Sequence, residues 1–114
     1  MQYLVQIFTG ESMEAWERLS EPEQQAITQE YMEISSTPGV IGGAQLQPPS
    51  TATTVRVQDG RTLTTDGPFA ETKEALGGYY LLEAEDLDVA IELAARIPAA
   101  RLGGAVEVRP LVVR

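Results

Sequence analysis

The sequence contains no cysteine and no histidine among its 114 residues. The lack of cysteine excludes disulfide bonds, thiolate catalysis and cysteine-ligated zinc or iron–sulfur sites. The lack of histidine removes the side chain that most often acts as a general base near neutral pH and most often binds metal ions. Acid–base chemistry would therefore depend on Asp, Glu, Lys, Tyr or water, and we expect neither a metal nor a cofactor.

Positive charge is also scarce, because 8 basic residues stand against 17 acidic ones and give a net charge of −9. A surface of that sign repels nucleic acid and anionic lipid. No segment approaches the roughly 18 apolar residues of a membrane helix, and residues 1–8 lack the positive charge and the apolar run of a signal peptide. We therefore expect a cytoplasmic protein that binds neither nucleic acid nor membranes.

The length and the apolar fraction of 43% predict one domain over residues 1–114. Residues 2–8 alternate as a β-strand. A short helical segment over 13–19 precedes a second helix, which Ser20 and Glu23 begin with a capping box and which runs to about Ser36. A short strand over 44–47 is expected next.

The second half of the chain predicts a hairpin, a strand, a helix and a last strand. Residues 52–57 and 61–65 alternate around Asp59-Gly60, a typical hairpin turn. A strand over 76–84 leads to a helix capped by Asp86, with a predicted buried face of Leu87, Ala90, Ile91 and Ala94. The order of elements indicates a ferredoxin-like β-α-β-β-α-β sandwich of the α+β class with an inserted β-hairpin.

Two amphipathic helices cover only one face of such a sheet. The other face carries Leu4, Phe8 and either Tyr79 or Tyr80, and a bare apolar face is unfavourable in water. The simplest remedy is a homodimer that packs sheet to sheet.

The segment over residues 65–74 begins Thr65-Asp66-Gly67-Pro68-Phe69 and leads into Gly77-Gly78-Tyr79-Tyr80. With residues 51–57, 97–100 and 106–110, it resembles the DGPF-type subgroup of the YCII-related (YciI-like) family over essentially the whole chain. The resemblance implies a single YCII-related domain that pairs into a dimeric α/β barrel. It also implies a bacterial protein of uncharacterised function, linked to extracytoplasmic-function sigma factors in a regulatory accessory role.

Related YciI-type proteins are thought to use a His–Asp pair in a cleft, and this sequence has no histidine. Asp66 alone remains as a counterpart, either as a general base or as the centre of an Asx turn. Phe69 either floors a ligand pocket or plugs the adjacent core, and we favour the plug. Glu71 and Lys73 either contact an anion at a cleft or form a solvated ion pair.

Tyr79 and Arg109 complete the set of candidate ligand-binding residues. Tyr79 is a potential proton donor beside Gly77-Gly78, a pair that either lets a ligand approach the backbone or forms a β-bulge. Arg109 and Glu107 are predicted on the sheet face away from the helices. There they would line a cavity between subunits or form a cross-strand salt bridge.

Three functions remain open from the sequence. The first is a dimeric protein that binds a small molecule in a cleft near Asp66, Phe69 and Lys73. The second is a metal-independent enzyme on a small metabolite, with Asp66 as its acid–base group. The third is a sigma-factor-associated module for protein interaction.

Overall fold

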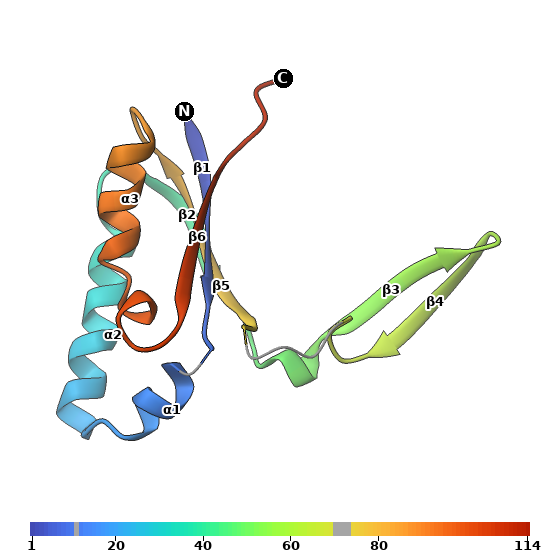
Figure 1. Cartoon of the computed structure of the whole chain (residues 1–114), viewed down its shortest axis with the longest axis horizontal. Coiled ribbons are helices and arrows are strands. Elements are labelled where there is room, and N and C mark those ends of the chain that lie inside the picture. The colour runs from blue at the N-terminus through green and yellow to red at the C-terminus, as the bar shows by residue number, and fades with distance from the viewer. Residues whose placement is uncertain (11, 70–73) are drawn as a thin grey trace.

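The computed structural model describes residues 1–10, 12–69 and 74–114. Its main elements, drawn in Figure 1, are β1 (Gln2–Phe8), α1 (Ser12–Glu17), α2 (Glu21–Ser35), β2 (Val40–Gln45), β3 (Thr53–Gln58), β4 (Arg61–Asp66), β5 (Leu76–Glu83), α3 (Leu87–Ala95) and β6 (Ala105–Pro110). Short 3₁₀ turns lie at Pro49–Thr51 and Pro98–Ala100.

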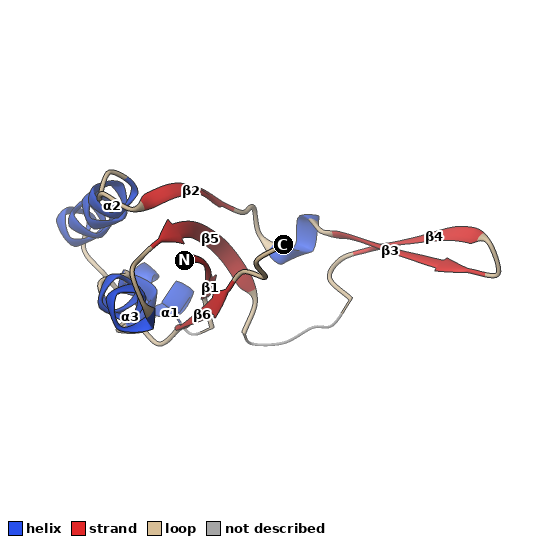
Figure 2. Cartoon of the chain, turned by 90° about the horizontal axis from the view of Figure 1, so that it is seen from above, coloured by secondary structure: helices blue, strands red, loops and turns tan. Residues whose placement is uncertain are grey.

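Four strands form an antiparallel sheet in the order β2-β5-β1-β6. Helices α2 and α3 lie side by side against one face of this sheet (Figure 2). The mixed α+β architecture and the strand order are compatible with the ferredoxin-like fold predicted from the sequence.

The core lies between this sheet and the helices. Tyr3, Val5 and Ile7 of β1 are buried, as the strict alternation predicts. Ile34 of α2 and Ile97 after α3 close over them, at 1% and 0% exposure. Burial of each such aliphatic side chain contributes about 1.5–3 kcal/mol.

Both long helices begin at the predicted caps. The Ser20 side chain accepts a hydrogen bond from the Glu23 N–H, and the Glu23 carboxylate accepts one from the Ser20 N–H, both at 3.3 Å. The Asp86 carboxylate accepts a bond from the Val89 N–H at 3.0 Å. These caps satisfy amide groups that the first helical turn leaves unpaired.

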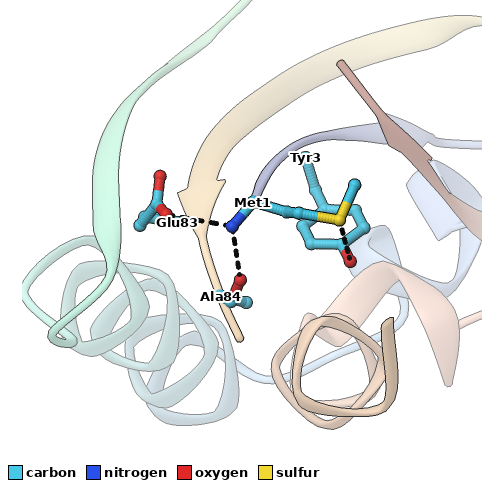
Figure 3. Close-up of polar contacts among 4 residues, drawn as sticks. All are labelled: Met1, Tyr3, Glu83 and Ala84. Carbon is cyan, nitrogen blue, oxygen red and sulfur yellow. Dashed lines mark hydrogen bonds and ion pairs between the residues drawn. The ribbon is translucent and has the colours of Figure 1, made fainter. Parts of the chain in front are cut away.

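The start of β1 is tied to the end of β5. The Met1 amino group donates to a Glu83 carboxylate oxygen at 3.1 Å and to the Ala84 carbonyl at 3.0 Å (Figure 3). The Ala84 N–H donates back to the Met1 carbonyl at 2.9 Å. The pairing of the two central strands thus extends past the last residues of β5.

Two sequence predictions need correction. Strand β2 begins at Val40, so Gly42 and Gly43 lie inside it and pair with Leu81 and Tyr80. The sequence predicts a strand only from residue 44, after these glycines, because glycine disfavours isolated strands, but pairing with β5 overrides that preference.

The buried face of α3 is the second correction. Ala90, Leu93 and Ala94 are buried, whereas Leu87 and Ile91 are each 48% exposed. The stripe through Leu93 continues to the buried Ile97, and this extra anchor selects it over the predicted stripe.

Strands β3 and β4 form a separate two-stranded hairpin, residues 53–66, which we call the arm. Both views show it projecting beyond the sheet face opposite the helices (Figures 1 and 2). The radius of gyration is 16.0 Å, against about 13 Å for a compact domain of similar size. The arm therefore extends well clear of the globular body.

Candidate functional site

A groove of about 900 Å³ lies on the helix side of the sheet, between α2 and the strands β2 and β5. Helix α1 supplies Met13 and Trp16 to its lining. Apolar and aromatic side chains form most of the wall, among them Ile7, Trp16, Ile27, Tyr31, Met32, Val40, Tyr80 and Leu102. This size is typical of small-molecule sites.

Two pairs of glycines help to form the hollow, because Gly42-Gly43 of β2 and Gly77-Gly78 of β5 all line it. Gly43 has a φ of 155°, and a Cβ at this position would lie 2.6 Å from the Tyr79 carbonyl oxygen. Only glycine fits such backbone without strain. The predicted bulge is present, since Ile7 pairs with Gly78 and Phe8 with Leu76.

Tyrosine side chains connect the groove to the core. The Tyr80 hydroxyl donates to the Tyr31 carbonyl at 3.3 Å, so β5 is tied to α2 across the layer. Burial raises the pKa of the Tyr31 phenol above its ordinary value of 10.0, and its hydrogen bond with the Ala99 backbone partly offsets that rise. Tyr31 is therefore neutral and able to donate a hydrogen bond at physiological pH.

The junction of α1 and α2 positions the indole at the groove. The Gln24 side-chain amide donates to the Trp16 carbonyl at 2.9 Å. Trp16 is half-buried and lines the groove. It is also the only tryptophan in the sequence, so all tryptophan fluorescence of the protein comes from this wall of the groove.

An ion pair supports the far wall. The Arg101 guanidinium donates to both Glu30 carboxylate oxygens, at 2.9 and 2.7 Å. The Arg101 hydrogen bonds lower the pKa of Glu30 below its ordinary value of 4.5. The pair holds α2 against the segment that carries Ala99 and Leu102, two lining residues.

The lining is uncharged throughout the described part of the chain, since no Asp, Glu, Lys or Arg contributes to it. Hydrogen-bonding groups come from Thr28, Ser35 and Gln45 together with the tyrosines. Such a surface can hold an uncharged, mainly apolar molecule and orient it through a few hydrogen bonds.

The structure does not gather the predicted site residues that it describes into one site, because Asp66 and Phe69 lie at the base of the arm while Tyr79 and Arg109 lie on the four-stranded sheet. Asp66 is the exposed last residue of β4 and does not line the groove. Phe69 is 80% exposed, so the predicted core plug is wrong for the single chain. The turn is held instead by the Gly67 N–H, which donates to the Ala52 carbonyl at 2.7 Å, and by the Thr54 hydroxyl, which donates to the Gly67 carbonyl at 2.8 Å.

Glu71 and Lys73 lie outside the described residues. Tyr79 borders the groove and is 37% exposed. Arg109 lies on β6, where its guanidinium contacts the Glu107 carboxylate. The expected cross-strand bridge is therefore a contact within one strand, because residues two apart on a strand share a face.

The sequence reasoning missed Gly43, Thr28 and Met32 as lining residues. Gln45 also lines the groove, where it pairs with Gly78 of β5. The available signal was the pair of Gly-Gly dipeptides, which lie on adjacent strands and remove side chains from one patch of the sheet.

The sheet face away from the helices, which we call the open face, is a second surface of interest. Its central pairs are Leu4 with Leu81 and Gln6 with Tyr79. Arg109 and Glu107 lie opposite Leu4 and Gln6 on β6, so both share this face, as predicted. Leu4, Phe8 and Leu81 are only half-buried in the single chain.

The described residues offer neither a metal site nor a membrane-spanning helix. They contain no cluster of three or more acidic side chains that could hold a metal ion. None of the helices they form has the length and apolar character needed to cross a membrane.

Comparison with known proteins gives the family. The YCII-related domain matches residues 1–113. The chain is also similar to an uncharacterized protein of Rhizobium meliloti (strain 1021), with 36% identity over 119 residues that cover 99% of this chain and 94% of that protein. The chain therefore belongs to the YCII-related family.

Proposed function

We propose that this protein binds a small, uncharged and largely apolar molecule in the groove between α2 and strands β2 and β5. The observation that carries the proposal is the groove itself, about 900 Å³ in volume and lined by Trp16, Tyr31 and Tyr80. A flat ring would stack on these aromatic side chains. This places the ligand on the helix side of the sheet rather than at the Asp66–Phe69 turn.

The uncharged lining supports this choice of ligand class. A carboxylate or ammonium ligand would lose its hydration in the groove without an opposite charge to replace it. A ligand hydroxyl could instead donate to the Ser35 or Thr28 hydroxyl oxygen, and a ligand carbonyl could accept from the Gln45 side-chain amide. We therefore expect affinity to fall when a charge is added to an otherwise identical ligand.

We further propose that the working unit is a homodimer packed through the open face, which would form the dimeric α/β barrel expected from the sequence. Support comes from the half-buried Leu4, Phe8 and Leu81, which a sheet-to-sheet contact would bury completely. Stacked sheets pack about 10 Å apart, so side chains of this size fill the interface.

Trp16 fluorescence tests the binding proposal directly. Titration with uncharged aromatic fragments, such as naphthol and its relatives, should change the emission with saturable affinity. Thr28→Phe, which fills the groove from α2, should weaken this binding at least about tenfold. Ala26→Phe adds the same ring at an exposed position of α2 outside the lining and serves as the matched control.

Two results would overturn the proposal. One is unchanged affinity in the Thr28→Phe protein, because the fragment would then bind elsewhere. The other is the absence of saturable emission changes with both uncharged and charged fragments. A preference for carboxylated fragments would retain the groove but reject the ligand class.

Catalysis through Asp66 is the second candidate function. Asp66 pairs with Thr53 and shares one face of the arm with Val55 and Val57. A second copy packed on that face would desolvate the carboxylate and prepare it for proton transfer. Asp66→Asn should then abolish turnover of a metabolite while leaving fragment binding intact.

The accessory role linked to sigma factors is a third proposal and would use the open face. If the protein is monomeric in solution, this face remains available to another protein. If the protein is a stable dimer, the open face is occupied by the second copy. That result would favour the small-molecule proposal over the sigma-factor proposal. Sedimentation analysis at micromolar concentration separates the two.

A further inference from the structure

The arm, residues 53–66, has little support within its own chain. Its two strands pair only with each other in the described residues. Its base is closed by the bond from the Gly67 N–H to the Ala52 carbonyl at 2.7 Å and the bond from the Thr54 hydroxyl to the Gly67 carbonyl at 2.8 Å. A lone two-stranded hairpin is marginally stable in water. Some further contact must therefore hold it in solution.

One face of the arm is suited to such a contact. Val55 and Val57 lie on it and are 58% and 68% exposed. They are directly opposite Thr64 and Thr62, so the face is free of charge between its two ends. β-branched side chains on neighbouring strands form a flat surface that packs well against another layer.

The position of the arm indicates what that layer is. The arm projects beyond the open face, on the side of the sheet opposite α2 and α3 (Figures 1 and 2). A second copy seated on the open face would therefore lie beside the arm. Of the described strands, only β3 and β4 lie past this face (Figure 2).

Charge favours a second copy as the occupant. The arm contains Arg56, Arg61, Asp59 and Asp66 and carries no net charge, so the rest of the chain carries the whole −9. Two acidic bodies repel each other. A neutral segment with exposed guanidinium groups is the part that can approach an acidic neighbour without this penalty.

We infer that the arm reaches across to a second copy of the chain and packs its Val55–Val57 face against that copy's body. This inference rests on the proposed homodimer and adds an exchange of arms to it. Asp66 lies on the same arm face. The exchange therefore places the Asp66–Phe69 turn at the boundary between the two copies, next to the open face.

Photo-crosslinking between labelled copies tests the contact. Val57 is replaced by benzoylphenylalanine in an unlabelled chain, which is mixed with nitrogen-15-labelled protein before irradiation. Crosslinked peptides that join a light arm to a heavy body are expected. The same probe at Thr65, which lies on the other arm face, is the control and should give few such products.

Solution affinity gives the second readout. Val57→Asp should weaken dimerisation at least about tenfold, because it buries an unpaired charge at the contact. Thr65→Asp adds the same charge to the opposite arm face and should have little effect. The core contains no arm residue, so neither variant should unfold the body.

The possible outcomes are distinct. A dimer without mixed crosslinks, or one equally sensitive to both aspartates, overturns the exchange and leaves the proposed dimer standing. A monomeric native chain overturns both. Mixed crosslinks together with selective weakening by Val57→Asp support the exchange.

Discussion

At the scale of single residues, Gly43 determines how closely β2 and β5 approach beneath the groove. Its φ of 155° lies outside the range that other residues adopt easily, and its missing side chain leaves room for the Tyr79 carbonyl. Strain at one backbone position costs about 1–3 kcal/mol. The absence of a side chain at Gly43 thus lets the two strands pair closely and also leaves the hollow above them unfilled.

We predict that Gly43→Ala lowers the free energy of unfolding by about 1–3 kcal/mol. The neighbouring Gly42→Ala is the matched control, because its Cβ would meet only the Leu81 Cβ at an ordinary 3.8 Å. Urea denaturation followed by far-ultraviolet circular dichroism measures both. Equal losses in the two variants would contradict the role given to Gly43.

Tyr31 gives a prediction about pH. Burial raises its pKa above 10.0 in the folded state, so the folded protein holds the phenolic proton more tightly than the unfolded chain does. The resulting stabilisation is complete below pH 10.0 and is lost as the pH rises through the folded-state pKa. Tyr31→Phe, which cannot ionise, should lose less stability than the native protein over this alkaline range.

Urea denaturation of both proteins at a series of alkaline pH values measures the difference. Tyr79→Phe is a suitable control because Tyr79 is 37% exposed. A Tyr31→Phe protein with the same alkaline loss of stability as the native chain would show that Tyr31 is not the titrating group.

At the scale of elements, α3 shows how two apolar stripes compete on one helix. The stripes 87-90-91-94 and 90-93-94-97 share two alanines and have the same helical spacing. Leu93 and Ile97 are buried, while Leu87 and Ile91 face outward. The helix therefore docks through its C-terminal half, close to the Pro98–Ala100 turn.

Leu93→Ala should accordingly destabilise the protein by about 2–5 kcal/mol, the usual cost of truncating a buried leucine. Ile91→Ala removes a side chain of similar size from the same helix but from its exposed side, and should cost less than about 1 kcal/mol. Thermal unfolding of the two variants distinguishes the stripes. A larger loss for Ile91→Ala would restore the face predicted from the sequence.

Local sequence signals therefore predicted most of the helices and strands, but they did not always predict which face of an element is buried. The caps at Ser20 and Asp86 and the Asp59-Gly60 turn depend on neighbours within a few residues, and all three are present. The choice between the two stripes on α3 depends on which side chains of the helix can pack against the sheet. That choice involves contacts across the chain, which a local pattern does not contain.

The candidate site was harder to predict for the same reason. A groove is space that side chains leave unfilled, and Gly43 marks it only once β2 is known to pair with β5. The Asp66–Phe69 turn was prominent in the sequence as a family marker. In the single chain it serves backbone geometry, through Gly67 and Thr54, and does not contribute to the groove.

At the scale of the whole molecule, shape and charge act in opposite directions. In the proposed dimer the open face and the arm would favour association, while a net charge of −9 on each chain would oppose it. The whole chain, arm included, is flat, with extents of 48 × 41 × 19 Å. Ionic strength should therefore control how much dimer forms.

We predict that raising the salt concentration from about 0.05 M to about 0.5 M tightens the dimer severalfold, because the Debye length falls well below 10 Å. Sedimentation equilibrium at both concentrations measures the change. Glu33→Gln with Glu92→Gln removes two exposed charges from the helix side and should reduce the salt dependence without touching the open face. A dimer that weakens with salt would mean that arginine contacts of the arm, not repulsion between acidic bodies, dominate the association.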